Sequence, residues 1–255
     1  MRLCVIAGTF HPEPGGPPTY LYHLLPALIE RGHSVSVITY EPSPESSGHP
    51  HPVLPPFTGE GGPQGREGAI GGIVNNIRRS SRLPGYSLNA HQPLAQAPYP
   101  YPVTRLTRQA SIPRRLLRFV REVLRQGRAA DALFVSDYGL PAALANLVLR
   151  KPLVMKIVSD FAWEFAARRG WTGLPVTDFQ AARHPIRVRM LRAVEGWYAR
   201  QADAVIVPSQ HVGRLVRGWG VPEARLRVIC NALPGQIGAD ILSSPRAALR
   251  RELDW

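Results

Sequence analysis

The sequence contains few cysteines and lysines and has no long uncharged hydrophobic run. Cys4 and Cys230 are its only cysteines, which is too few for a disulfide framework or a structural zinc site. Both lie in apolar runs, so we expect buried, inert thiols in a reducing compartment. The first apolar run, residues 3–8, is too short for the core of a signal peptide, and the longest, Leu140–Leu149, is shorter than the ~20 residues that span a membrane. We therefore expect a cytoplasmic protein without a membrane span, in solution or peripheral on the inner face of the membrane.

Several signatures of catalysis and nucleotide binding are also absent. The sequence has no G-x-G-x-x-G after its first predicted strand, no G-x-x-x-x-G-K-[ST], no G-x-S-x-G and no H-E-x-x-H. It has no D-x-D, so nothing supports a metal ion held by two alternate aspartates. His49 and His51 lie in a proline-rich stretch without partner ligands, and we interpret them as solvated loop residues.

Arginine is the residue in excess. Lys and Arg together number 31 against 18 Asp and Glu, a formal net charge of +13, and Lys151 and Lys156 are the only lysines. Such a balance favours an anionic partner, either nucleic acid, an acidic membrane surface or a phosphorylated substrate. An arginine-rich genome composition is the alternative explanation. We expect no nucleic-acid partner, because the sequence has no recognised binding motif and no basic run interleaved with stacking aromatics.

The first forty residues predict a β-α-β unit. The continuously apolar run Leu3–Ala7 indicates a strand buried on both faces, and Thr19–Arg31 has apolar residues at helical spacing and ends at Gly32. Ser34–Thr39 is the next predicted strand, parallel to the first.

Regular patterning stops at Glu41 and resumes at Pro113. Residues 41–102 read as an irregular insertion rich in proline and glycine, with Ile70–Ile77 as its one strand-like stretch. The later predicted elements are the helix Pro113–Gly127, strand Ala132–Val135, helix Pro141–Leu149, strand Leu153–Val158, helix His184–Gln201, strand Ala204–Val207, helix Ser209–Trp219 with Ser209 as N-cap, and strand Leu226–Cys230. Repeated βα units in a chain of 255 residues predict one α/β domain over residues 1–233, a Rossmann-like, doubly wound parallel sheet.

The first candidate site is the loop with Gly15 and Gly16, between the first strand and the first helix. Doubly wound folds bind ligands at this position. Glycines let the backbone approach a ligand closely, and a helix N-terminus offers unpaired N–H groups and partial positive charge. Pro17 and Pro18 suit the first helical turn. The alternative is a simple tight turn without a ligand.

The second candidate site is Asp160, which follows the predicted strand Leu153–Val158. An acid at the carboxyl end of a central strand points into the ligand crevice, where it can orient or deprotonate an acceptor hydroxyl. The alternative is a cap for a helix beginning at Phe161, with Glu164 favourable in its first turn. Trp163 and Glu164 are candidate acceptor contacts, and packing is the alternative for Trp163.

The predicted helix Pro113–Gly127 has an apolar face of Ile112, Leu116, Leu117, Val120, Val123 and Leu124 among several arginines. The commoner arrangement packs such a face on the sheet and leaves the arginines solvated. A membrane-surface helix would instead lay the face into the headgroup region. In either arrangement Arg114, Arg115, Arg118 and Arg121 are candidate contacts to an anionic membrane surface.

Three stretches of the sequence resemble the amino-terminal half of retaining glycosyltransferases of the family-4 type, which have the GT-B architecture. The resemblance is carried by M-R-L-C-V-I-A-G-T-F-H-P-E-P-G-G-P-P-T-Y with the ending R-G-H-S-V-S-V-I-T, by K-P-L-V-M-K-I-V-S-D-F-A-W-E, and by A-D-A-V-I-V-P-S-Q-H-V-G-R-L-V-R-G-W-G-V-P-E-A-R-L-R-V-I-C-N-A-L. It covers 1–40 and about 131–233, and it implies that the chain is one half of a GT-B fold.

The resemblance also implies a chemistry. A sugar would pass from a nucleotide-sugar donor, the co-substrate, to a glycan or lipid-linked acceptor, with retention and without a metal or bound cofactor. Gly15 and Gly16 match the family's glycine pair near the donor diphosphate and the acceptor. Asp160 matches the aspartate of a frequent His-Asp pair, but Ser159 stands where that histidine often is, and Asn231 matches the linker asparagine.

The resemblance places the donor-binding domain after this chain. Residues 234–255 are then a linker and the truncated start of that domain, so the chain carries the acceptor-side half of the active site and is expected to be inactive without the other half. The alternative function is a non-catalytic acceptor- or membrane-binding subunit that pairs with a separate donor-binding chain. A nucleic-acid-binding α/β protein ranks last.

Overall fold

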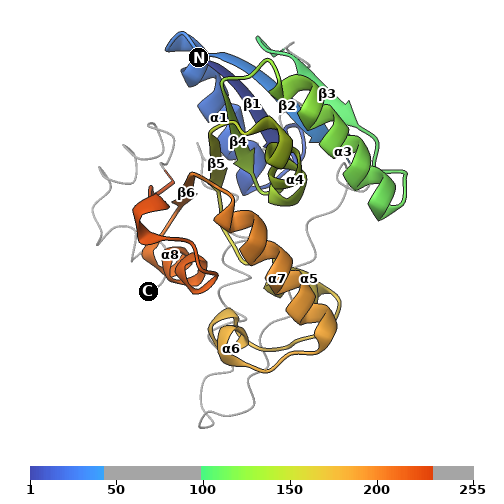
Figure 1. Ribbon diagram of the computed structural model, residues 1–255, viewed down its shortest axis with the longest axis vertical. Coiled ribbons are helices and arrows are strands. Elements are labelled where there is room, and N and C mark those ends of the chain that lie inside the picture. The colour runs from blue at the N-terminus through green and yellow to red at the C-terminus, as the bar shows by residue number, and fades with distance from the viewer. Residues whose placement is uncertain (43–98, 232–255) are drawn as a thin grey trace, which may run out of the picture. The chain divides into compact units, whose positions relative to one another are not determined.

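The computed structural model describes residues 1–42 and 99–231, which form a seven-stranded sheet with helices on both faces (Figure 1). The strand order is β3-β2-β1-β4-β5-β6-β7, and every neighbouring pair is parallel. The strands are β1 (Arg2–Ala7), β2 (Ser34–Tyr40), β3 (Val103–Leu106), β4 (Ala132–Ser136), β5 (Leu153–Lys156), β6 (Ala204–Val207) and β7 (Leu226–Val228). The fold is the Rossmann-like, doubly wound α/β sheet that the repeated βα units predict.

Described helices connect β1 to β2 and each successive pair of strands from β3 to β7. They are α1 (Gly16–Glu30), α3 (Ile112–Gly127), α4 (Gly139–Leu149), α5 (Phe161–Arg168), α6 (Val176–Ala181), α7 (Ile186–Arg200) and α8 (Gln210–Gly218), and a short 3-10 helix, Glu223–Arg225, precedes β7. No helix of the described residues is long and apolar enough to cross a membrane.

Successive side chains of β1 point to opposite faces of the sheet, so each face has its own hydrophobic core. Val5 and Ala7 pack in a cluster with Leu21 and Leu25 of α1. Cys4 and Ile6 belong to a larger cluster to which α3, α4, α7 and α8 contribute. A third, small cluster joins α5, α6 and α7 through Ala166, Phe179 and Val188.

The helix α3 covers the sheet, as expected of a domain helix, and the predicted face is confirmed at Val120, Val123 and Leu124, which pack in the core, but is wrong at Ile112 and Leu117. Phe119, Val123 and Gly127 are its buried residues, while Ile112 and Leu117 are 67% and 60% exposed. Phe119 packs edge-on against Tyr40 and Tyr138.

The prediction of two buried thiols is right for one cysteine and wrong for the other. Cys4 is fully buried in β1, and burial raises the pKa of its thiol to about 11. Cys230 is exposed. It follows the last strand of the sheet, which ends at Val228, and no further strand covers it among the described residues.

Besides the short 3-10 helix, two elements were not predicted, and several predictions lie outside the described residues. The edge strand β3 directly follows a Pro-Tyr-Pro-Tyr-Pro run, and all its residues are half-buried, so no apolar run marks it. The helix α6 is only 6 residues long. The strand-like stretch Ile70–Ile77, the loop histidines His49 and His51, residues 43–98 of the irregular insertion and the linker 234–255 belong to the part of the chain that is not described.

Candidate functional site

The sheet changes its winding direction between β1 and β4. The chain leaves β1 toward β2 on one side and leaves β4 toward β5 on the other, so the loops after β1 and β4 diverge. Ligands of doubly wound sheets bind at such a switch point, outside the carboxyl ends of the strands. The loop from Gly8 to Gly15, which leads into α1, follows β1 at this edge.

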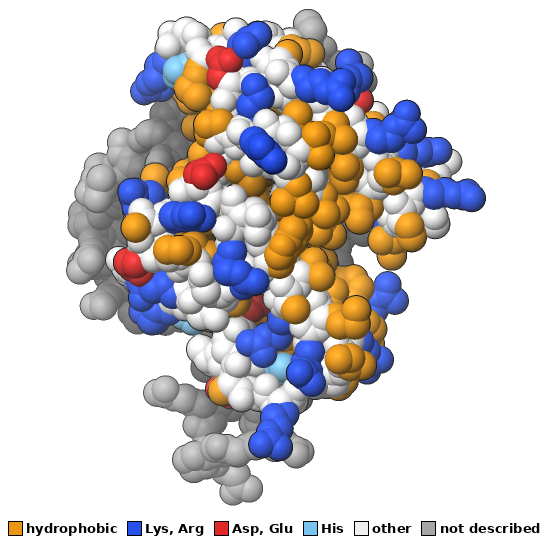
Figure 2. Space-filling view, viewed as in Figure 1, with side chains coloured by type: hydrophobic (Ala, Val, Ile, Leu, Met, Phe, Trp, Pro, Cys, Tyr) orange, Lys and Arg blue, Asp and Glu red, His pale blue; other side chains and the backbone are white. Residues whose placement is uncertain are grey.

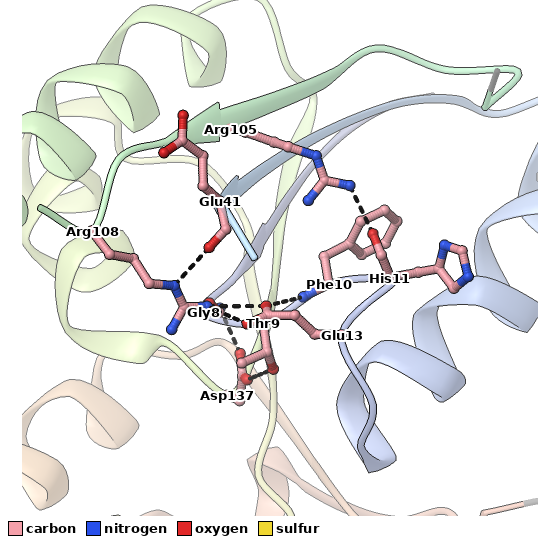
Figure 3. A network of polar contacts seen from close by, with 9 residues as sticks. All are labelled: Gly8, Thr9, Phe10, His11, Glu13, Glu41, Arg105, Arg108 and Asp137. Atoms are coloured by element: carbon pink, nitrogen blue, oxygen red, sulfur yellow. Dashed lines mark hydrogen bonds and ion pairs between the residues drawn. The ribbon is translucent and has the colours of Figure 1, made fainter. Parts of the chain in front are cut away.

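Asp137, the residue after β4, holds the start of that loop (Figure 3). Its Oδ1 accepts a hydrogen bond from the Gly8 N–H at 2.8 Å, and its Oδ2 accepts one from the Thr9 hydroxyl at 2.8 Å. Asp137 has a positive φ of 67°, which aspartate adopts more readily than most residues. Burial raises the pKa of Asp137 to about 6, although the residue retains solvent-exposed surface.

Two arginines from the β3 side hold the rest of the loop (Figure 3). Arg108 Nη2 donates to both carboxylate oxygens of Glu13, at 2.9 and 3.0 Å, and to the Gly8 carbonyl at 3.1 Å. Its Nε donates to the Glu41 carbonyl at 2.8 Å. Arg105 Nη2 donates to the His11 carbonyl at 2.7 Å. These contacts fix the backbone that precedes the glycine pair.

Gly15 and Gly16 lie at the start of α1, as predicted, and they differ in what the backbone demands of them. Gly15 has φ 140°, a conformation that L residues rarely adopt, and its carbonyl accepts hydrogen bonds from both the N–H and the hydroxyl of Thr19. Gly16 has no such constraint, and apart from its chain neighbours and the backbone of its own helix no described atom lies within 4 Å of the position that a Cβ would occupy. The space over Gly16 is open.

The N-terminus of α1 offers fewer free backbone N–H groups than a helix N-terminus normally does. Pro17 and Pro18 occupy the second and third positions of α1 and carry no N–H. Gly16 alone supplies an N–H among the first three helical residues. An anion at this end of α1 therefore needs donors from elsewhere.

Asp160 forms the N-cap of α5, the structural alternative considered from the sequence. Its Oδ1 accepts a hydrogen bond from the Trp163 N–H at 2.7 Å, and its Oδ2 accepts one from Gln180 Nε2 at 2.7 Å. The residue is 2% exposed. No contact among the described residues joins Asp160 to the glycine pair.

The two candidate acceptor contacts lie in the first turn of α5. Trp163 is half-buried, packs against the small cluster of α5, α6 and α7, and donates from Nε1 to the Leu174 carbonyl at 2.9 Å. Glu164 is also half-buried, and its N–H donates to the Asp160 carbonyl. Trp163 therefore packs within the domain, and its contact with an acceptor stays a prediction.

Glu195 of α7 lies against Asp160 and was not predicted. It is 2% exposed, and its two carboxylate oxygens accept the Phe161 and Ala162 N–H groups at 2.8 and 2.9 Å. Burial, reinforced by the negative charge of Asp160, raises the pKa of Glu195 well above its usual range. The start of α5 is thus held by two buried carboxyl groups.

Lys156, the last residue of β5, was also not predicted, although it is the one charged residue inside the apolar run of that strand. It is 3% exposed. Its Nζ donates to Asn231 Oδ1 at 2.7 Å and lies 3.3 Å from the centroid of the Tyr20 ring. Burial lowers the pKa of Lys156.

Asp137 could have been predicted from the sequence, whereas Arg105 and Arg108 could not. Asp160 was selected because it is an acidic residue after the carboxyl end of a central strand, and Asp137, which directly follows β4, meets the same criterion. No pattern marks Arg105 or Arg108. No group of three or more His, Cys, Asp and Glu side chains that could hold a metal ion is found in residues 1–42 and 99–231.

Three of the four arginines proposed for a membrane are exposed on α3, namely Arg114, Arg118 and Arg121. The fourth, Arg115, is half-buried, with its guanidinium 6.0 Å from the Tyr40 ring centroid. Figure 2 shows a band of hydrophobic side chains on the face of α3, α4 and α7, with arginine or lysine side chains beside it. The large exposed hydrophobic residues of these three helices are Ile112, Leu117, Leu147, Val148, Ile186, Met190 and Val194.

A doubly wound parallel sheet with a glycine loop at its switch point defines a Rossmann-like domain. Residues 15–232 match the family model of the glycosyl transferase 4-like domain. The chain belongs to this family, and its sheet is one half of a GT-B glycosyltransferase fold.

Solved structures have the same fold at low sequence identity. HepE from Anabaena in complex with UDP has a TM-score of 0.51 and 15% identity over 100% of this chain and 50% of its own. Sucrose-phosphate synthase from Thermosynechococcus elongatus has a TM-score of 0.50 and 18% identity, over 100% of this chain and 52% of its own. The chain thus spans about half the length of these proteins. A comparison with curated proteins finds no match.

Proposed function

We propose that this chain is the acceptor-side half of a glycosyltransferase that moves a sugar from a nucleotide-sugar donor to a glycan or lipid-linked acceptor with retention. Membership of the glycosyl transferase 4-like family supports glycosyl transfer in general. The complex of HepE with UDP is consistent with a uridine nucleotide as part of the donor. On this proposal the chain alone has little or no transfer activity.

The observation that carries the proposal is the geometry of the glycine pair. The loop before it is fixed from β3 and β4, Gly15 has a conformation suited to glycine, and the space over Gly16 is open. A ligand can therefore approach the backbone of Gly16 closely without displacing a side chain. We assign this surface to the donor diphosphate and the adjoining part of the acceptor.

Asp160 keeps its proposed role as the acceptor-side catalytic group under one condition. Its Oδ1 caps α5, so only Oδ2 is available, and an acceptor hydroxyl would have to replace Gln180 Nε2 there. Trp163 and Glu164, one turn into α5, would line the same acceptor position. We expect no metal in this chemistry.

The exposed surface favours a second candidate function, a non-catalytic subunit that binds an acceptor or membrane and pairs with a donor-binding chain. The apolar band over α3, α4 and α7, with the exposed Arg114, Arg118 and Arg121 nearby, suits an anionic lipid surface. The same surface would serve a peripheral enzyme that acts on a lipid-linked acceptor.

The test is sugar transfer in extracts of the encoding organism whose own gene carries wild-type, Gly16→Ala or Gly218→Ala chain. Each extract receives a panel of labelled nucleotide sugars, and label in endogenous glycans and lipids is measured. Gly218, at the end of α8, is the matched control, because among the described residues its Cβ position is likewise open apart from its chain neighbours and helix backbone. We expect Gly16→Ala to lose a labelled product that Gly218→Ala retains. Identical products from all three extracts would contradict the proposal.

A further inference from the structure

Lys156 lies at the switch-point edge and faces α1. In the sheet, Ala7 is paired with Ser136 and Ser136 with Lys156, so the three side chains lie on the same face. Ala7 packs in the cluster of α1. The contact of Lys156 Nζ with the ring of Tyr20 agrees with this, because Tyr20 lies one helical turn after Gly16.

The charge of Lys156 has no counter-charge among the described residues. Its two contacts, the Asn231 amide oxygen and the Tyr20 ring, are both uncharged groups. No described carboxylate lies within 4.0 Å of Nζ, whereas four other basic residues do have such partners. A buried cation without an anion is costly, and an apolar side chain of similar length would avoid that cost. An anionic ligand would supply the missing charge.

The surroundings restrict where that anion would lie. The open space over Gly16 is about one helical turn from Tyr20, at the positive end of the α1 dipole. Pro17 and Pro18 withhold two of the N–H donors that a helix end normally offers an anion. A lysine ammonium has three N–H groups, and it can keep Asn231 as one partner while it donates to a ligand.

We propose that Lys156 is an anion-binding residue whose Nζ donates to a phosphate oxygen of the ligand over Gly15 and Gly16. This proposal rests on the proposed function, which places a diphosphate there. The diphosphate can belong to the nucleotide-sugar donor or to a lipid-linked acceptor. Lys156 supplies the donor that the two prolines of α1 remove.

The presence of only two lysines makes the proposal directly measurable. The 255-residue chain is labelled with ¹⁵N throughout, and the Nζ resonances of Lys151 and Lys156 and the amide resonance of Gly16 are followed by NMR. Pyrophosphate, UDP and farnesyl diphosphate are titrated separately at constant ionic strength. We expect each active ligand to shift the Lys156 and Gly16 resonances with one saturation curve and to raise the pKa of Lys156, while Lys151 stays unchanged.

The three ligands also distinguish the source of the diphosphate. A response to UDP assigns the site to the donor, and a response to farnesyl diphosphate without one to UDP assigns it to the acceptor. Either result supports the inference that Lys156 binds an anion. A joint shift of the Lys156 and Gly16 resonances with pyrophosphate alone supports it as well. Lys156→Met should weaken the Gly16 response about tenfold or more, whereas Lys151→Met should leave it unchanged.

Three results would overturn the inference. If the Gly16 amide responds and Lys156 does not, Lys156 has no ligand role and the proposed function stands. If both lysines shift in parallel, the effect is nonspecific attraction to a basic protein. If neither Gly16 nor Lys156 responds, the ligand position in the proposed function fails as well.

Discussion

Replacing Asp160 by alanine tests the cap of α5. The substitution removes the acceptor for the Trp163 N–H, an N-cap contact that typically contributes about 1 kcal/mol. It also removes the acceptor for Gln180 Nε2, and a hydrogen bond to a charged group contributes about 1.5–3 kcal/mol. We expect Asp160→Ala to lower the free energy of unfolding by roughly 2.5–4 kcal/mol.

Asp160→Asn should be milder because its amide oxygen can still cap α5. Its NH₂ group would face Gln180 Nε2, so one donor loses its acceptor, at a cost of about 1 kcal/mol. Urea unfolding followed by circular dichroism at pH 7 measures both changes. The exposed Asp178→Ala, on the neighbouring helix α6, is the control and should stay within about 0.5 kcal/mol of wild type. If Asp160→Ala has the same free energy of unfolding as wild type, Asp160 does not stabilise α5 as its N-cap.

The same substitution separates the cap from catalysis. A role for Oδ2 on an acceptor hydroxyl predicts that Asp160→Asn, in a protein with transfer activity, folds but loses most of its kcat/KM. If Asp160→Asn keeps the wild-type kcat/KM with the native acceptor, Asp160 only caps the helix.

Three further changes have defined outcomes. Gly15→Ala forces a positive φ on alanine and should lower the free energy of unfolding by about 1 kcal/mol or more. Gly16→Ala should have a free energy of unfolding equal to or above that of wild type. Equal urea midpoints for the two variants would contradict this difference. The pKa of Glu195 is raised on folding, so its contribution to stability is complete below about pH 4 and is lost as pH rises through the folded pKa. Thermal unfolding from pH 5 to 9 should therefore show a fall in stability that Glu195→Gln flattens, and an unchanged slope would disprove the assignment. Iodoacetamide should modify Cys230 and spare Cys4 in the native chain, as read by peptide mass spectrometry; modification of Cys4 would contradict its burial.

Much of the fold is predictable because its elements have strong local signals. The strand Ala204–Val207 has the bounds predicted, and Ser209 caps α8 by accepting the Val212 N–H at 3.3 Å. The β-α-β start is an uninterrupted apolar run, an amphipathic helix and a second apolar run. The edge strand β3 was missed because its residues are only half-buried and prolines precede it.

Side-chain contacts between distant segments were not predictable from local pattern. Arg108 reaches Gly8 and Glu13 across about a hundred residues of sequence, and nothing near Arg108 marks it as a partner. Glu195 lies on an amphipathic helix, where spacing predicts a face but not burial against Asp160. Lys156 did give a signal, because a charge inside a strand buried on both faces needs an explanation.

Hydrogen bonds made by arginine side chains within the fold explain part of the excess of basic over acidic residues. Arg105 and Arg108 hold the loop after β1, and Arg192 donates to the Gln180 side chain at 3.2 Å. Arg108 pairs with Glu13, whereas Arg105 and Arg192 contact carbonyl or amide oxygens, so hydrogen bonds within the fold account for part of the arginine excess. Arg114, Arg118 and Arg121 are exposed on α3 and remain candidates for an anionic surface.

The most direct test of the central claim is to determine the product formed by the protein isolated from the encoding organism. The protein is incubated with each nucleotide sugar and with lipids and glycans from the same cells. Mass spectrometry detects the added sugar, and NMR reads its anomeric configuration. We predict one new glycosidic bond with the anomeric configuration of the donor, together with an equal amount of released nucleoside diphosphate. A product of inverted configuration would contradict retention, and nucleotide-sugar turnover no greater than in buffer would contradict glycosyl transfer.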